Sequence, residues 1–365
     1  MLVSFHESYL LLVQICVLFC ILTMGYSLFE YLTRGIRQKR QMKKVELLKE
    51  MLTEYAKSRE KERKKMHRKF FRIMKHPNGL LALNAALDKM GWDDSRKMDP
   101  MTRRELCELL TERYIGIHHK EDEAVQGLGI SLITRCDASS SSQLKMLMLK
   151  NLEAKNLLVR IETLRCISAQ RNRRLMLSAL ECIDKNPHYF SNKLLTDTLI
   201  EFQGNKKALM EEIWEKRKSY SPDTQVSVIQ MITVLKEESF AGRMYELLDN
   251  EEEDKEVRLA AIKYFRNVHR PEYRKRLAGF IADSSWEYGA VAANVLQSYD
   301  CREIFEELLE GSVSRNWYVR NNCAKTIVSC CSGEQIEKAL HMNDRYGRDS
   351  IMYAWKSIEK EEAAS

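Results

Sequence analysis

The feature that most constrains this chain is a short phrase that recurs eight times after residue 121. A small or polar residue begins each copy, and an apolar residue follows three positions later in seven of the eight. The copies begin at Asp122, Asn156, Asn192, Asp223, Asp254, Ser285, Asn316 and Gly347. Their starts are separated by 34 and 36 residues and then five times by 31. A fixed period of this length predicts an α-solenoid.

Each phrase also has the chemistry of a helix start. Asp, Asn and Ser side chains accept hydrogen bonds from the amide groups of a first helical turn, so we predict an N-cap at each start. The third residue after each start is Val125, Val159, Leu195, Val226, Val257, Tyr288, Val319 or Ser350. Five residues beyond this position every copy is apolar, and eight residues beyond it only Gln203 is not. This spacing predicts one buried stripe per helix, and a second amphipathic segment completes each hairpin.

The position four residues beyond the Val-like residue is small in most copies, as at Ala261 and Ala292. Small side chains there predict close approach between neighbouring helices. The phrase resembles the HEAT repeat, especially its short bacterial form of roughly 31 residues that is also seen in phycobilin-lyase-like proteins. The Asp, Val and Arg pattern of that family is matched best by Asp254, Val257 and Arg258, by Asn316, Val319 and Arg320, and by Asn156, Val159 and Arg160. The resemblance covers about two-thirds of the chain and implies an all-α fold with binding surfaces.

An uncharged, apolar run lies close to the beginning of the chain. No charged residue occurs between Glu7 and Glu30, and a run of this length can cross a bilayer core of about 30 Å as a helix. No Lys or Arg precedes the run, which favours an uncleaved anchor over a signal peptide. Arg34, Arg37, Lys39, Arg40, Lys43 and Lys44 follow it directly. By the positive-inside rule, we expect a single-pass protein of the cell membrane with its N-terminus outside and its repeats in the cytoplasm.

The positive charge of the chain is local. Residues 34–75 contain 17 Lys or Arg and five Glu, a balance of +12; the whole chain carries +7, so the remainder carries −5. No Pro or Gly lies between Ile36 and His76, and we predict one basic helix of about 40 residues there. Two interpretations compete: a solvated stalk with some coiled-coil or domain contact, or attraction to the anionic headgroups of the cytoplasmic leaflet, which applies best to the first six basic side chains. Nucleic-acid binding remains a lesser alternative, because no aromatic platform accompanies the charge.

These boundaries give five segments. We predict an extracytoplasmic N-terminus (1–7), a transmembrane helix (8–30), a basic juxtamembrane helix (31–76), a helical N-terminal cap (77–121) and HEAT-like repeats (122–365). The ten cysteines show no CxxC spacing, so reduced thiols are expected, with the adjacent Cys330 and Cys331 as a lesser candidate for redox sensitivity.

Motifs that carry catalysis are missing from the sequence. It contains no GxGxxG, GxxxxGK[ST], GxSxG or HExxH pattern. His118 and His119, followed by Glu121, Asp122 and Glu123, are interpreted as a solvated loop rather than as metal ligands. HEAT-like di-iron hydroxylases carry paired His-Glu motifs, whereas His6-Glu7 is the sole His-Glu pair here. We therefore predict no enzyme activity, catalytic residue, cofactor or metal site, although catalytic groups on separate repeats would leave no local motif.

The remaining candidate for function is a surface. Trp286 and Trp317 each follow a cap residue and are 31 residues apart, so they should lie on adjacent repeats along one edge. Arg258 and Arg320 occupy a shared position of the repeat. These four residues either join neighbouring hairpins or form an aromatic and cationic strip for an acidic partner segment.

The sequence as a whole indicates a membrane-tethered cytoplasmic scaffold or adaptor. Its expected partners are proteins associated with the same membrane, and binding to nucleic acid is not favoured. The alternative from another class is a catalytic or ligand-sensing HEAT-like protein.

Overall fold

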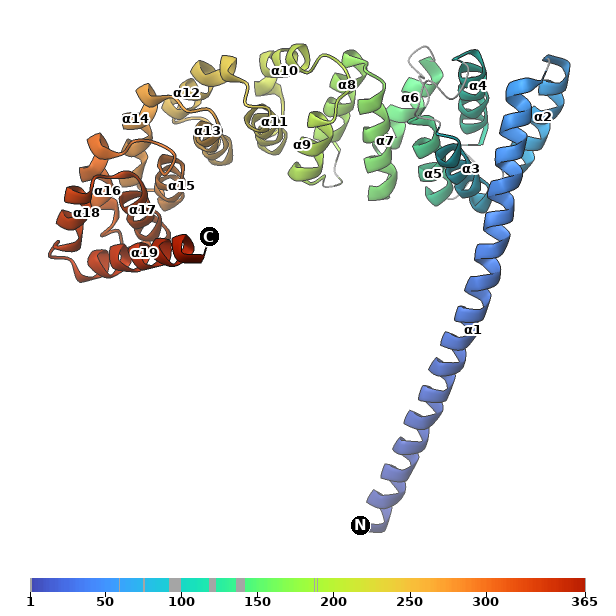
Figure 1. Cartoon of the computed structure of the whole chain (residues 1–365), viewed down its shortest axis with the longest axis horizontal. Coiled ribbons are helices and arrows are strands. Elements are labelled where there is room, and N and C mark those ends of the chain that lie inside the picture. Colours follow the sequence, from blue (N-terminus) through green and yellow to red (C-terminus); the bar gives the residue numbers. More distant parts are fainter. Residues whose placement is uncertain are drawn as a thin grey trace. The chain divides into compact units, whose positions relative to one another are not determined.

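The computed structural model describes residues 2–58, 60–74, 76–91, 100–117, 123–135, 142–186, 188 and 190–364. Within these ranges every regular element is helical (Figure 1). The expected all-α class is therefore confirmed. The chain forms two compact units, residues 1–166 and residues 167–365, each of which is described by itself. The predicted cap at Asp122 and the cluster from His118 to Asp122 lie outside the described residues.

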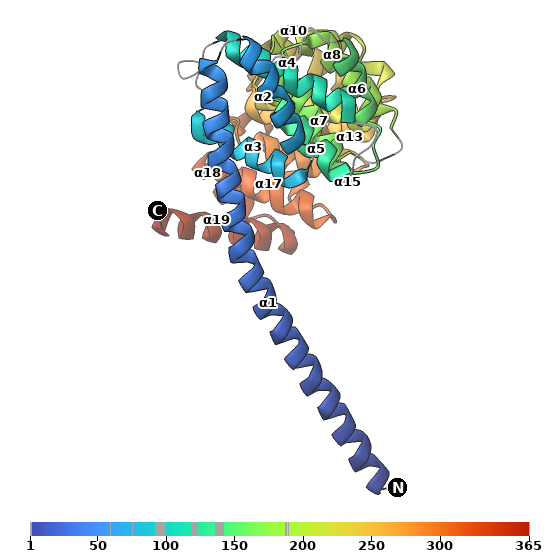
Figure 2. The same cartoon turned by 90° about the vertical axis from the view of Figure 1, so that its right-hand side faces the viewer.

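The first unit begins with a helix much longer than any other. Its elements are α1 (Leu2–Lys57), α2 (Glu60–Ile73), α3 (Pro77–Met90), α4 (Pro100–Ile117), α5 (Glu123–Ile133), α6 (Ser142–Asn151) and most of α7 (Leu157–Ala169). In α1 the apolar run and the first part of the basic stretch form one continuous helix, which Figure 2 shows leaving the first unit. Apolar side chains from Leu12 to Phe29 are exposed along it.

The basic stretch is divided into two helices, which differs from the single helix expected to reach His76. Helix α1 ends at Lys57, and the next residue, Ser58, accepts a hydrogen bond from Arg63 Nε at 2.9 Å through its carbonyl oxygen. The charged run that follows Lys57 presents no apolar stripe. The chain therefore buries more apolar surface by folding back than by continuing as one helix, because α2 can then bury Met66 and Phe70 against α1.

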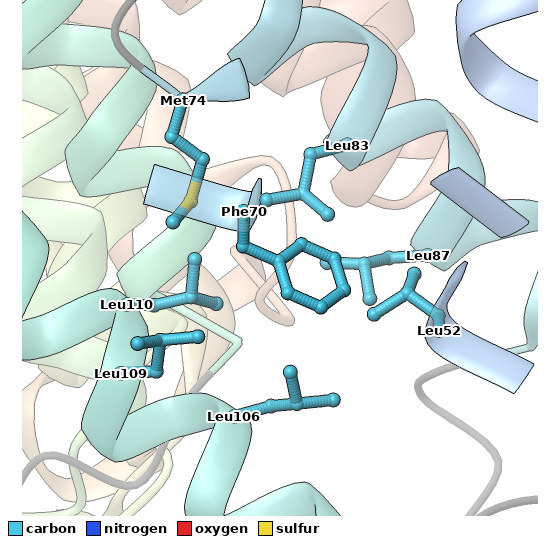
Figure 3. A pocket seen from close by; sticks show the side chains of 8 residues that line it. All are labelled: Leu52, Phe70, Met74, Leu83, Leu87, Leu106, Leu109 and Leu110. Carbon is cyan, nitrogen blue, oxygen red and sulfur yellow. The ribbon is translucent and has the colours of Figure 1, made fainter. Parts of the chain in front are cut away.

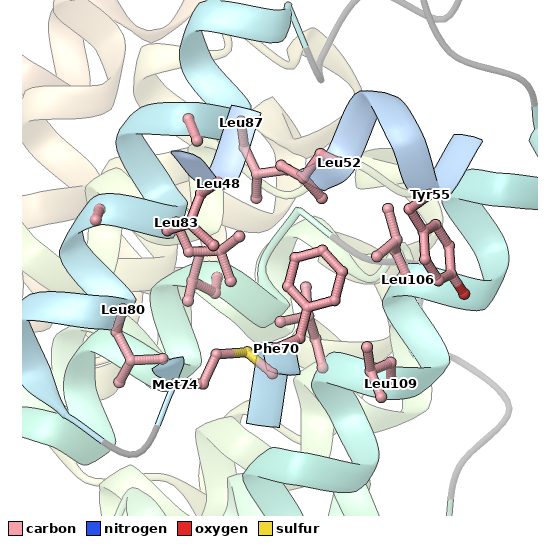
Figure 4. Packing of buried hydrophobic residues seen from close by; sticks show 14 of the residues in the cluster. Leu48, Leu52, Tyr55, Phe70, Met74, Leu80, Leu83, Leu87, Leu106 and Leu109 are labelled. Atoms are coloured by element: carbon pink, nitrogen blue, oxygen red, sulfur yellow. The ribbon is translucent and has the colours of Figure 1, made fainter. Parts of the chain in front are cut away.

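The core of the first unit joins α1 to the helices that follow it. Val45, Leu48, Leu52 and Tyr55 of α1 are buried among side chains of α2, α3 and α4, with Phe70 at the centre (Figure 4). The hydroxyl of Tyr55 lies 2.9 Å from Nε2 of His67 and donates to Glu105 at 3.2 Å. Burial, reinforced by Glu105, raises the pKa of Tyr55 to about 12. The part of α1 from Val45 to Tyr55 is therefore packed in the first unit, whereas the basic residues before it are exposed.

The second unit repeats one packing step. Its longer helices are α8 (Arg173–Asp184), α9 (Asn192–Ile200), α10 (Lys206–Glu215), α11 (Pro222–Val234), α12 (Ala241–Asp249), α13 (Lys255–Asn267), α14 (Arg274–Gly279), α15 (Trp286–Leu296), α16 (Phe305–Gly311), α17 (Trp317–Cys330), α18 (Gly333–Leu340) and α19 (Arg345–Ala364). Short 3-10 turns η1 (Arg217–Ser219), η2 (Glu238–Phe240), η3 (Pro271–Tyr273), η4 (Phe280–Ala282) and η5 (Arg302–Ile304) accompany the second helices. From α9 onward, each odd-numbered helix packs against the next odd-numbered one, as Figure 1 lets the reader follow.

The predicted N-caps are correct at three of the described starts. The side chains of Asn156, Asp254 and Asn316 accept backbone N–H bonds of the helix that follows. Ser285 holds the N-cap position of α15, but its hydroxyl donates to Glu287 instead.

At the other three starts the predicted cap lies inside the helix. Ser191 and Ser221 are the N-cap residues of α9 and α11, so Asn192 and Asp223 are helical, and Pro222 fixes the backbone for the first turn of α11. Gly347 donates its N–H to Asp344, because α19 begins at Arg345. More than one polar residue precedes these helices, and a pattern cannot choose among adjacent cap residues.

The expected buried stripe is present through the middle repeats. Met231, Ile262, Ala293 and Ala324 are fully buried, as are the small residues Ala261, Ala292 and Cys323. Exceptions lie at Val234, which is 55% exposed, and at Trp355, which is 37% exposed.

Close helix approach in the second unit can be tested at Gly289 of α15. A Cβ added there would lie 2.9 Å from the carbonyl oxygen of Ile281, which is backbone and cannot move aside. We expect Gly289→Ala to lower the free energy of unfolding by about 1–3 kcal/mol through overpacking. The matched control is Gly242→Ala in α12, where no atom lies within 4 Å, and which should stabilise the helix by about 0.5–1 kcal/mol. Urea unfolding followed by circular dichroism measures both; equal effects would contradict the packing described.

Candidate functional site

Three aromatic side chains meet at the beginnings of α15 and α17. Trp286 and Trp317 are the first residues of these helices, and Tyr318 follows Trp317. The ring of Tyr318 stacks on Trp286 with centroids 5.4 Å apart and contacts Trp317 edge-on at 5.1 Å. The three side chains are nevertheless 42%, 56% and 55% exposed. We call Trp286, Trp317 and Tyr318 the aromatic edge.

The loop before α17 holds this edge in place. The side chain of Asn316 accepts from the N–H groups of Tyr318 and Val319 at 2.9 and 3.4 Å. Ser314 Oγ accepts from the Asn316 N–H at 3.2 Å, and Arg320 donates to the Ser314 carbonyl at 2.7 Å. The cap and Arg320 together fix the direction in which the helix, and with it Trp317, begins.

The charges beside the aromatic edge are engaged in internal contacts. Lys255 Nζ pairs with Glu287 at 2.7 Å. Their hydrogen bond lowers the pKa of Glu287 and raises that of Lys255. Arg348, which is the equivalent of Trp317 in the next repeat, donates to the Met342 carbonyl at 3.0 Å. The edge therefore presents mainly aromatic surface.

Arg258 and Arg320 lie beneath the surface to different extents. Arg258 is 8% exposed and donates to the Leu248 carbonyl at 3.0 Å. Its guanidinium lies 4.9 Å from the ring centre of Tyr288 and 5.6 Å from that of Phe280. Arg320 is half-buried against the loop at Ser314. Arg258 is therefore bonded to the end of α12, and Arg320 to the loop that precedes its own helix.

Exposed large apolar side chains of the second unit are concentrated in its last part, from α15 to α19. In the described part of the second unit nine such residues occur, and eight lie between residues 286 and 355. They are Trp286, Val313, Trp317, Tyr318, Tyr346, Met352, Tyr353 and Trp355. Tyr318, Tyr346 and Tyr353 were missed by the sequence reasoning; the position of Tyr318 directly after Trp317 was the available signal. Because the three exposed rings of the aromatic edge contact one another, they form a contiguous apolar surface, which marks a candidate interaction site.

The first unit contains a small apolar void among its described residues, and a more open hollow along α1 is lined by Glu46, Lys49, Glu50, Thr53, Glu54 and Lys57. The void, of about 10 Å³, is lined by Leu52, Phe70, Met74, Leu83, Leu87, Leu106, Leu109 and Leu110 (Figure 3). A space of this size and chemistry is too small and too apolar to hold a polar ligand. No group of His, Cys, Asp or Glu in the described ranges is placed to hold a metal ion.

The six basic residues after the apolar run are all exposed along α1. Arg34, Arg37, Lys39, Arg40, Lys43 and Lys44 precede Val45, the first residue of α1 in the core of the first unit. Arg34 lies 3.4 Å from Glu30. At 1.5 Å per residue, the six cover about 15 Å of helix between the apolar run and the packed unit. The helix that contains the run is long and apolar enough to cross a membrane.

Comparison with known proteins gives little beyond the fold. No family model matches the chain, and no curated protein matches it. One similar solved structure is human deoxyhypusine hydroxylase in complex with glycerol, an all-helical HEAT-repeat protein. It is 15% identical, covers 88% of this chain and 98% of its own, and has a TM-score of 0.29.

This comparison corrects one expectation. The sequence predicted that the chain is not an enzyme, whereas the matched structure is that of an enzyme, so that prediction is contradicted and we withdraw it. At this level of similarity no residue role or reaction is transferred.

The division between buried Arg258 and exposed Trp317 predicts different effects on stability. Arg258→Ala removes a charged donor from a buried carbonyl and a cation from two rings, so we expect a loss of about 2–3 kcal/mol. Trp317→Ala removes one exposed edge-on ring contact, and we expect about 1 kcal/mol or less. Urea unfolding of the two variants beside the wild type tests this order; an equal or larger loss for Trp317→Ala would show that the edge is structural.

Proposed function

We propose that this chain is a membrane-tethered scaffold or adaptor that binds protein partners through a HEAT-like α-solenoid. The observation that carries the proposal is the aromatic edge, where the Asn316 cap holds Tyr318, Tyr318 contacts both Trp286 and Trp317, and all three rings remain about half exposed. Aromatic side chains supply a large contact area at low entropic cost, and they are frequent at the energetic centres of protein interfaces. The partner would be a protein segment that offers apolar side chains to these rings.

The tether in this proposal is the apolar part of α1. Its side chains find no cover within the protein, since none of the most apolar stretch is buried. Lipid would supply that cover, and the following basic residues would lie at the cytoplasmic headgroups. The second unit would then be cytoplasmic, where confinement to the membrane raises its effective concentration toward membrane-bound partners. We further propose a bacterial member of the HEAT-like family, on the resemblance of its 31-residue period.

The orientation of the anchor can be tested by neutralising basic residues. Arg34→Gln, Arg37→Gln and Lys39→Gln together remove half of the adjacent positive charge, so we expect part of the population to invert. The control changes the exposed Arg68, Lys69 and Arg72 to Gln, which removes the same charge farther from the span and should have no effect. C-terminal reporters that are active on only one side of the membrane measure orientation. An extracytoplasmic C-terminus in the wild type would contradict the proposal.

The docking role can be tested on the aromatic edge. We expect Trp286→Ala with Trp317→Ala to reduce recovery of a crosslinked partner by about 30-fold or more, because two interface anchors are lost. The matched control is Val234→Ala, since Val234 is 55% exposed and Trp317 is 56% exposed. In-cell crosslinking and affinity purification of the full chain from its native membrane, with quantitative mass spectrometry, measures recovery.

Two results of that purification would count against the scaffold. Equal recovery with the double variant and with Val234→Ala would remove the edge from the interaction. If no recovered protein depends on the second unit, but a recovered small molecule does, the result would favour ligand binding instead.

A further inference from the structure

Three cysteines from adjacent repeats lie together at the ends of α15 and α17. Cys301 follows the loop after α15, Cys330 is the last residue of α17, and Cys331 is the next residue. The backbone N–H of Cys301 donates to the carbonyl of Cys330 at 3.3 Å, so the two residues are direct neighbours. Cys331 Sγ lies 3.9 Å from the carbonyl oxygen of Cys301. The sequence had paired Cys330 with Cys331, and the structure brings Cys301 beside them.

The thiols of Cys301 and Cys330 both point toward the C-terminal end of α15. Cys301 Sγ lies 3.1 Å from the carbonyl oxygen of Leu296, and Cys330 Sγ lies 2.9 Å from that of Gln297. These carbonyls belong to consecutive residues at the end of α15. The two thiols lie beside consecutive carbonyls and the backbones of the two residues are hydrogen-bonded, which brings the side chains together as a disulfide requires.

The segment that carries Cys301 is fixed on both sides. Tyr299 donates from its hydroxyl to the Phe265 carbonyl at 2.8 Å, and Arg274 donates to the Asp300 carbonyl at 2.8 Å. From the following repeat, Gln335 donates to the Arg302 carbonyl at 2.8 Å. These bonds hold Cys301 against Cys330, so the pairing is part of the packing between repeats.

The two thiols differ in access and in proton affinity. Cys301 is fully buried, whereas Cys330 is half-buried. A hydrogen bond between them raises the pKa of Cys301 and lowers that of Cys330, because the Cys301 S–H can donate to a Cys330 thiolate. Burial raises the pKa of the nearby Cys331 and of the fully buried Cys323 to about 12. Cys330 is therefore the thiol suited to react first.

We propose that Cys301 and Cys330 form a reversible disulfide when the protein meets a peroxide. The Cys330 thiolate attacks one oxygen of hydrogen peroxide, the O–O bond breaks, and the product is a Cys330 sulfenic acid with one hydroxide, which takes up the thiol proton as water. The Cys301 sulfur then attacks the Cys330 sulfur, the S–O bond breaks, and the Cys301 proton leaves with the hydroxyl as a second water. Two thiols are oxidised by two electrons and one peroxide is reduced to two waters.

The disulfide would join the far ends of the two helices that carry the aromatic edge. It would replace the hydrogen bond between the two thiols by a covalent link between consecutive repeats. A reducing cytoplasm would return both thiols, since intracellular disulfides of this kind are transient. The inference does not depend on the proposed docking function.

The test uses the full chain in detergent, treated with graded hydrogen peroxide and then quenched with N-ethylmaleimide. Tryptic cleavage after Arg276, Arg302, Lys325 and Lys338 places Cys301 in peptide 277–302 and both other cysteines in peptide 326–338. We expect a reducible crosslink between these peptides, lighter than their sum by two hydrogen atoms. Free Cys330 should disappear at least about tenfold faster than free Cys323.

Single variants identify the bond. Cys331→Ser should keep the crosslink and Cys330→Ser should remove it. Cys301→Ser should also remove it, and should leave a sulfenic acid at Cys330 that a cyclic diketone traps. A disulfide confined to peptide 326–338 would overturn the proposal, as would a crosslink that survives Cys301→Ser or Cys330→Ser. Unreacted Cys330 at peroxide levels that oxidise the fully buried Cys323 would overturn it as well.

Discussion

The structure of the second unit depends on how closely each odd-numbered helix can approach the next. That approach is permitted by Ala261, Ala292 and Cys323, which are fully buried one position before the stripe residues Ile262, Ala293 and Ala324. Backbone then lies near backbone, and polar side chains bridge the gap: Thr326 donates to the Ala293 carbonyl at 2.7 Å, and Asn322 donates to the Ala290 carbonyl at 2.8 Å. A repeat gains its burial from its neighbours rather than from its own interior, as expected for stacked hairpins. Both the aromatic edge and the cysteine cluster follow from this spacing.

Periodicity predicted this stack because a residue and its equivalent 31 positions later occupy neighbouring repeats. Trp286 and Tyr318 are 32 residues apart and their rings stack; Cys301 and Cys330 are 29 apart and their backbones bond. The sequence placed the tryptophans together by this rule, but the cysteines were compared only with near neighbours in the chain. Applied to every chemically reactive residue, the same rule would have indicated Cys301. The equivalence weakens at α19, where the helix begins earlier than the period requires and Trp355 replaces the buried Ala324.

The N-cap residues and helix ends were harder to predict than the repeat period. A Ser or Asp lies just before each of α9, α11 and α19, and the choice among polar residues depends on where tertiary packing begins the helix. The basic stretch posed a similar problem, because no Pro or Gly announces the end of α1 at Lys57. The interruption of the apolar stripe after Lys57 was the available signal for the end of this helix. A helix that loses its buried face gains stability only by turning back onto a core. Charge alone suggested a stalk, whereas Leu48 and Leu52 show that α1 belongs to a packed unit.

One helix therefore has to meet two different environments. Before Arg34, α1 exposes apolar side chains that water would not accommodate; beyond Val45 it is an amphipathic member of a protein core. The exposed basic residues from Arg34 to Lys44 fit neither the hydrocarbon interior of a bilayer nor the core of the protein. In the proposed membrane arrangement they would set how closely the packed unit approaches the bilayer. Because α1 is continuous through this region, the core that holds Leu48 and Leu52 also holds the direction of the apolar segment relative to the first unit. A membrane around that segment would thus orient a folded unit rather than a flexible tail.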